Sequence, residues 1–149
     1  MVTTDTYARL LALRTGLRRF QRWSEQQARL AGLTPTQHQL LLAVRGHRDQ
    51  RGPTIGEVAD YLLLRHHSVV GLVDRAASAG LVVRRRDPDD HRVVRVGLTS
   101  SGAARLETLS AAHLEELKRL TRQISGLWDG LEPAQTAHGF SKPRSSADA

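Results

Sequence analysis

Apolar residues recur at three- and four-residue spacing in two long stretches of the chain, the period of an amphipathic helix. The first runs from about Leu10 to Leu30, and arginines fill much of the remaining helix surface. The second follows Thr99 as a helix cap and carries an apolar stripe from Leu106 to Leu127. Because this stripe continues for about six turns, we expect it to pack against a partner surface.

Two capping boxes mark the starts of further helices between these stretches. Thr34 is followed three residues later by Gln37, and Thr54 is followed by Glu57. In this motif the threonine side chain accepts from a backbone N–H of the first turn, and the Glu or Gln side chain accepts from the N–H of the threonine. The sequence therefore predicts helices from 35 to about 48 and from 55 to about 62.

The order of elements after residue 64 is the most informative pattern in the chain. Residues 65–79 form an amphipathic helix that Gly80 ends, and 81–86 and 94–98 read as two short strands. The charged turn DPDDHR, residues 87–92, joins them. A short helix, a second helix and a hairpin in this order predict a mostly α fold with a small two-stranded β-wing, a winged helix-turn-helix.

Several motifs of this segment recur together in one known family. They are LVDR at Leu72–Arg75, GLVVRRRDPDDHR and LTSSG, preceded by LTPTQHQLLLAV and TIGEVADYLLL. With them the chain resembles the MarR family of bacterial transcription regulators from roughly Tyr7 to Leu127. The resemblance implies a homodimer that binds palindromic double-stranded DNA, acts as a repressor and is released by a small-molecule effector.

The resemblance also divides the chain into segments. Residues 1–33 are expected to form an N-terminal dimerisation helix, 34–98 the DNA-binding lobe, and 99–129 a long C-terminal dimerisation helix. Family members usually end with another amphipathic helix. Here Pro133 and Gly139 interrupt the pattern, so we expect 130–149 to be a frayed tail.

Composition narrows the choice of partner. The chain has a net charge of +7, and 20 of its 22 basic residues are arginine, which favours a polyanion such as DNA. Aromatic residues make up only 4%, which disfavours base stacking on single strands. Because the chain contains no cysteine, sensing of oxidants through a thiol is excluded.

The chain shows neither a long apolar run nor the basic and apolar start of a signal peptide. We therefore expect a cytoplasmic protein without a membrane partner.

The candidate DNA contacts fall into two groups. The N-terminal part of a recognition helix reads base edges. An arginine of the wing enters the minor groove, and Arg92 is the candidate for this contact. Many relatives carry arginine where this chain has Gly71, so here either the backbone approaches DNA closely or fewer bases are read. The candidates on the helix are Arg65, His66, His67, Ser68, Gly71 and Arg75, and those on the wing are Arg84, Arg85, Arg86, Arg92 and Arg95.

These candidates have structural alternatives as well. The polar residues at the helix start would equally serve as exposed caps, and Arg92 as a solvated turn charge. We expect Arg75 to touch phosphate and Asp74 to hold a wing or helix arginine, with a simple surface ion pair as the alternative. Asp90 is expected to pair locally.

The seven histidines suggest no metal site. His66 and His67 are adjacent, so their side chains diverge by about 100° on a helix. We therefore expect no metal, no cofactor and no enzyme activity, since no hydrolase or phosphate-loop motif occurs either. His38 and His113 could meet across a ligand cavity, or simply pack in the interior.

Two other classes of protein are alternatives to a DNA-binding regulator. A winged helix that has lost DNA binding and serves protein interaction is disfavoured by the basic wing. A metal-dependent enzyme is disfavoured by the lack of a ligand set. Trp23 and Trp128 are expected in the core or an interface.

Overall fold

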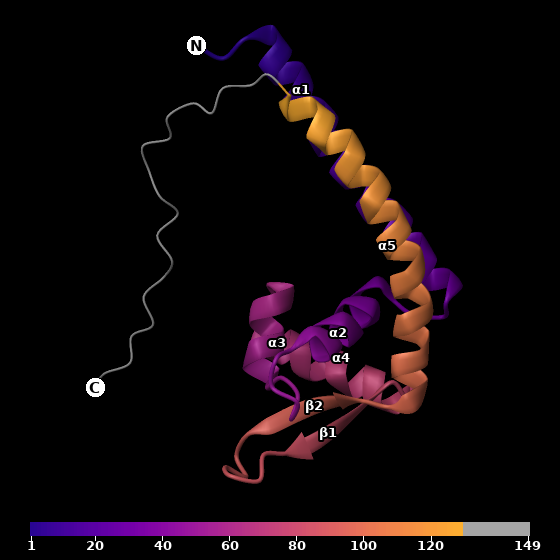
Figure 1. Cartoon of the computed structure of the whole chain (residues 1–149). Coiled ribbons are helices and arrows are strands. Elements are labelled where there is room, and N and C mark those ends of the chain that lie inside the picture. Colours follow the sequence, from indigo (N-terminus) through magenta and orange to yellow (C-terminus); the bar gives the residue numbers. More distant parts are fainter. Residues whose placement is uncertain (130–149) are drawn as a thin grey trace, which may run out of the picture.

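A computed structural model describes residues 1–129 of the chain and shows five helices and one antiparallel two-stranded sheet in that range (Figure 1). This architecture confirms the predicted winged helix-turn-helix. The elements in chain order are α1 (Thr4–Leu30), α2 (Pro35–Gly46), α3 (Ile55–Leu62), α4 (His66–Ser78), β1 (Val82–Arg86), β2 (Val94–Leu98) and α5 (Ser100–Trp128). The predicted frayed tail, 130–149, lies outside the described residues.

The two long helices α1 and α5 lie side by side and extend from the rest of the molecule as an arm (Figure 1). They run antiparallel, so that the start of α1 lies beside the end of α5. There the Arg9 guanidinium donates to the carbonyl oxygens of Leu127 (2.7 Å) and Asp129 (2.9 Å). We call α1 and α5 the arm, and the remaining elements, residues 34–98, the lobe.

Part of the apolar stripe of α5 is covered by the same chain. Leu120 is 7% exposed, and its Cδ1 lies 3.4 Å from the position a Cβ on Gly16 of α1 would take. Leu117, one turn earlier, is 40% exposed. The partner surface that the stripe requires is therefore supplied partly by α1, and only the half-exposed residues remain for a second molecule.

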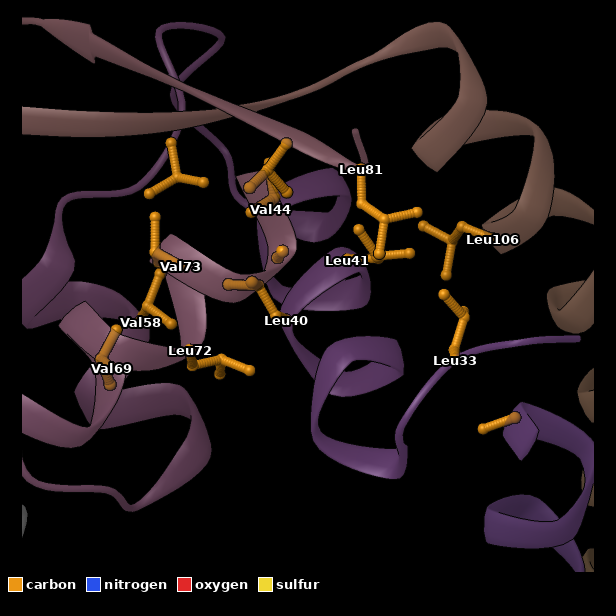
Figure 2. Packing of buried hydrophobic residues seen from close by; sticks show 14 of the residues in the cluster. Leu33, Leu40, Leu41, Val44, Val58, Val69, Leu72, Val73, Leu81 and Leu106 are labelled. Atoms are coloured by element: carbon orange, nitrogen blue, oxygen red, sulfur yellow. The ribbon is translucent and has the colours of Figure 1, made fainter. Parts of the chain in front are cut away.

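The core of the lobe is built around α2. Its adjacent residues Leu40 and Leu41 are both fully buried, so neighbouring elements pack on two sides of this helix (Figure 2). Leu106 of α5 joins the same cluster, which makes the base of the arm continuous with the lobe core. The predicted apolar stripe of α4 is buried as expected: Val69, Leu72, Val73 and Ala76.

Local capping chemistry forms as the sequence predicts. The Thr34 hydroxyl accepts from the Gln37 N–H at 3.1 Å, and the Gln37 side chain accepts from the Thr34 N–H at 3.0 Å. Thr54 and Glu57 form the same reciprocal pair. These bonds satisfy first-turn N–H groups that have no partner within the helix, so they fix where α2 and α3 begin.

The LTSSG motif joins the wing to the arm. The Thr99 hydroxyl accepts from the Gly102 N–H at 3.0 Å and donates to the Gly80 carbonyl oxygen at 2.6 Å. Gly102 is buried against Leu81: a Cβ on it would overlap the Leu81 carbonyl oxygen and lie 3.0 Å from the carbonyl carbon. Glycine at this position lets the first turn of α5 pack directly on the backbone that leads into β1.

The wing is anchored to the start of α3. Within the hairpin Val82 pairs with Leu98, and Arg85 with Arg95. An isolated bridge joins Arg95 to Thr54, and the Val96 N–H donates to the Pro53 carbonyl oxygen at 2.9 Å. The hairpin thus gains a third, very short neighbour that ties it to the helix-turn-helix.

Candidate nucleic-acid interface

The first turn of α4 presents polar side chains away from the core. Arg65, His66 and His67 are exposed, and Ser68 and Gly71 are partly exposed. The buried stripe of α4 faces α2 and α3, so these residues can contact a ligand while the core packing stays intact.

The start of α4 differs chemically from the other helix starts. Among the described residues, α1, α2, α3 and α5 each begin with a threonine whose side chain accepts from a first-turn N–H. The residue that precedes α4 in this capping position is Arg65, and its side chain makes no cap hydrogen bond. This helix start lies in an exposed, basic turn, an arrangement that favours an anion such as phosphate.

The wing and the start of α4 border one hollow of about 480 Å³. His66 and Val70 line it from α4, while Arg84 and Arg92 line it from the wing. Arg84, Arg85, Arg86 and Arg92 are all exposed. The fold therefore places two groups of predicted contacts, one on α4 and one on the wing, along one surface.

Two wing arginines carry a local acidic partner. Arg84 forms an ion pair with Asp74 of α4, and Arg92 Nε lies 3.1 Å from Asp90 Oδ1. Hydrogen bonds from the Arg92 side chain and backbone lower the pKa of Asp90. The expected local pairing of Asp90 is confirmed, and Asp74 pairs with a wing arginine in a contact that also fits the surface ion pair given as its alternative. The Arg92 side chain remains 91% exposed.

Gly71 makes room for Arg75 one turn later on the same helix. A Cβ on Gly71 would lie 3.2 Å from Arg75 Nη1, so the guanidinium lies directly over the glycine. The absence of a side chain at position 71 thus sets where the charge of Arg75 is presented.

Arg95 has a different role from the one predicted. Its side chain is only 14% exposed, its Nε donates to Asp87, and its Nη1 donates to the Gly52 carbonyl oxygen at 2.8 Å. Since these contacts hold the guanidinium against the protein, Arg95 is not free to reach phosphate. Arg95 therefore fixes the wing, and this geometry does not favour the DNA contact predicted for it.

Asp87 is the acidic centre of this anchor. It is 4% exposed, and its Oδ1 accepts from the backbone N–H groups of Asp89 (2.8 Å) and Asp90 (3.2 Å). The hydrogen bond from Arg95, followed by these backbone bonds, lowers the pKa of Asp87 from 3.8 to about 2. Ionised Asp87 therefore stabilises the fold above pH 3.8, and this contribution is lost as the pH falls toward 2.

Residues in the loop between α2 and α3 complete the anchor and were not predicted. Arg51 Nη2 lies 2.8 Å from Asp49 Oδ2, and its Nη1 lies 3.1 Å from Asp89 Oδ2 in the wing turn. Opposite charges in two separate turns were the available signal, but only the folded chain brings those turns together.

His38 and His113 do meet beside a cavity. Their ring centroids are 4.8 Å apart, and both line a cavity of about 320 Å³ bounded by α1, α2 and α5. Trp23 packs at 4.8 Å from the His113 ring, whereas Trp128 is 45% exposed. Within residues 1–129, no group of three or more His, Asp or Glu side chains is placed to hold a metal ion, and no helix is long and apolar enough to cross a membrane.

Comparison with known proteins finds matches in sequence and in fold. The profile of the MarR family matches residues 31–93. The HTH-type transcriptional repressor YetL of Bacillus subtilis is 30% identical over 95 residues, a match that covers 63% of this chain and 56% of YetL. The chain thus matches a little over half of that relative's length.

Solved structures extend the likeness to the arm. A mutant MarR from E. coli is 25% identical with a TM-score of 0.61, and the match covers 85% of each chain. The S. aureus MepR–DNA complex is 24% identical with a TM-score of 0.65 over 79% of this chain and 84% of that one. The lobe thus matches the MarR family in sequence, and lobe and arm together are similar in fold to solved MarR-family structures.

Proposed function

We propose that the protein is a DNA-binding transcription regulator that represses a palindromic operator. The observation that carries this proposal is the shared surface of the uncapped start of α4 and the exposed wing arginines, which border one hollow. MepR, whose fold this chain shares, has been solved in complex with DNA. The direct test is an electrophoretic shift on the promoter DNA beside the protein's own gene, repeated over a range of salt concentrations.

The interface divides by the kind of contact. The part that reads base edges in the major groove consists of Arg65, His66, His67, Ser68 and Gly71. Arginine side chains around this part of the interface contact phosphates. Arg92 extends toward the minor groove. The phosphate-contacting residues are Arg75, Arg84, Arg85 and Arg86.

The proposal includes a homodimer formed through the arm, with 1–33 and 99–129 as its dimerisation segments and 34–98 as its DNA-binding lobe. Large apolar side chains remain exposed along α1 and α5 although the two helices already pack on each other, and such a surface is typical of an interface. Two lobes would then meet half-sites about one DNA turn, roughly 34 Å, apart. The exposed arm residues are Tyr7, Leu10, Leu11, Leu17, Leu114, Leu117 and Trp128.

A small-molecule effector would bind in the cavity of about 320 Å³ where α1 and α5 meet α2. This cavity lies between arm and lobe, so a ligand that binds better to one relative position of these two parts shifts the population toward it. Release of DNA follows if the favoured position spaces the two lobes wrongly for the operator.

Arg92→Ala should lower operator affinity by about 1 to 3 kcal/mol if this side chain enters the groove. Arg85→Ala should weaken binding to all sequences alike and reduce the slope of log affinity against log salt by about one phosphate contact. Fluorescence anisotropy with operator and unrelated duplexes measures both effects. Lys118→Ala, an exposed cation on the arm, is the control. Unchanged affinity in both wing variants would show that the wing is not engaged.

Ser68→Ala and His67→Ala should each reduce discrimination at one or two half-site positions, by about 1 to 3 kcal/mol for each base-edge hydrogen bond that the substitution removes. Both side chains lie off the buried face of α4, so the melting temperature should barely change. A panel of operator variants measures the discrimination. Uniform weakening across the panel would instead assign these residues to phosphate binding.

A further inference from the structure

His38 of the lobe and His113 of the arm form the polar centre of the contact between these two parts. The rings are 4.8 Å apart and tilted by 60°, and the His38 residue is 4% exposed. We call the surface around them, where α2 meets α1 and α5, the seam. A charge on either ring would therefore lie between the lobe and the arm.

The hydrogen bonds of His113 are compatible with either protonation state. One ring nitrogen, Nδ1, donates to the Leu109 carbonyl oxygen at 2.7 Å, and Nε2 lies 2.7 Å from the buried Ser24 hydroxyl of α1. In the neutral ring Nε2 accepts from Ser24. In the protonated ring Nε2 donates to the same oxygen, because a hydroxyl serves both roles. His113 is thus held in place whatever its charge.

The described residues that line the cavity beside the pair include no carboxylate that could balance a positive charge. Of the described residues lining the cavity, α1 contributes Phe20, Gln21 and Ser24, α2 contributes Gln39 and Leu42 beside His38, and α5 contributes Ser110, Leu114 and Leu117 beside His113. The two imidazoles are therefore its only titratable groups. Burial first, and the neighbouring His113 second, lower the pKa of His38 below its usual 6.5.

We propose that the seam is a proton-sensitive latch, in which protonation of His38 beside His113 separates lobe from arm and weakens operator binding. This inference rests on the proposed DNA-binding function and adds the proton as a regulator of it. The sign follows from linkage: the closed seam holds the proton on His38 less tightly than an open, hydrated seam does. The closed form is fully favoured above pH 6.5 and loses stability as the pH falls below that value.

The first measurement follows the seam without DNA. Because the chain contains no cysteine, Asp60→Cys on α3 and Arg122→Cys on α5, both at exposed positions, place two spin labels at unique sites, one on the lobe and one on the arm. The distance between the labels should change between about pH 7.5 and about pH 5.5. His38→Gln should abolish that change, whereas His91→Gln, on the exposed wing turn, should retain it.

The second measurement links the seam to DNA. Acid also acts on groups outside the seam, so the informative quantity is the ratio of operator affinities of the unaltered protein and His38→Gln at each pH. We expect this ratio to fall at least about fivefold over the same pH range, the low end of usual coupling between sites. A constant ratio overturns the proposal, even if the label distance moves.

His113→Gln provides a second variant in case His38→Gln folds poorly. Removing the neighbouring imidazole takes away one cause of the lowered pKa of His38, so the label transition should move to higher pH. A label distance that is independent of pH in the unaltered protein overturns the latch whether or not DNA binds. Failure to bind DNA at any pH overturns the proposed function alone.

Discussion

Replacing Gly102 by alanine should lower the free energy of unfolding by about 3 kcal/mol, the upper end of the usual penalty for overpacking. The new methyl group would overlap the Leu81 carbonyl oxygen, which is a backbone atom and cannot rotate away as a flexible side chain could. Gly102 lies in the first turn of α5, which Thr99 fixes through bonds to the backbone on both sides of the junction. Relief of the overlap requires the arm to shift away from the lobe.

Gly126→Ala is the matched control in the same helix. Among the described atoms, none lies within 4 Å of the position that its Cβ would take, so alanine adds helix propensity without a clash. This variant should gain about 0.5 to 1 kcal/mol. Urea unfolding monitored by circular dichroism compares the two, provided that the slopes agree with that of the unaltered protein. Equal shifts in both variants would contradict the proposed role of Gly102.

Leu117→Asp should convert the proposed dimer to monomers and lower operator affinity about 100-fold, because one lobe then binds its half-site without the advantage of linkage to the second. Leu117 is 40% exposed in the single chain, so a carboxylate there is tolerated by the monomer and is costly only when a second arm covers it. Sedimentation velocity and operator titration measure the two effects on the same sample.

Ala111→Asp adds the same charge at an exposed position of the same helix and should leave both properties intact. Leu120→Asp is unsuitable, because Leu120 is buried against α1 and its replacement would disrupt the arm itself. A monomeric Leu117→Asp protein that binds the full palindrome with unaltered affinity would refute the proposed assembly.

Elements specified by neighbouring residues could be predicted from the sequence. The capping boxes at Thr34 and Thr54 and the buried face of α4 depend on spacings of three and four residues, and all three formed as predicted. Gly80, with φ of 73°, ends the segment of α4 as expected of a residue free to adopt that conformation.

Features that depend on distant partners were harder to predict. Arg95 looks like any other wing arginine in sequence, and only the fold shows that Gly52, 43 residues earlier, accepts from its guanidinium. The stripe of α5 was expected to require a partner, but its periodicity does not tell whether that partner is α1 or a second molecule. Charge and hydrophobic periodicity describe the helix or strand to which a residue belongs. The contacts that the residue makes depend on which other part of the chain packs against it.

The uncapped start of α4 implies that the residue that best stabilises the free protein differs from the residue that best stabilises its complex with DNA. A Ser, Thr or Asp cap at position 65 would contribute about 1 kcal/mol to folding, as such residues commonly do. It would also occupy the N–H groups that a phosphate could otherwise meet, and an aspartate would repel that phosphate. A variant chosen only for heat resistance would thus tend to acquire a cap there and lose affinity for its operator. Under the proposed function, maximum stability and maximum operator binding therefore require different residues at position 65.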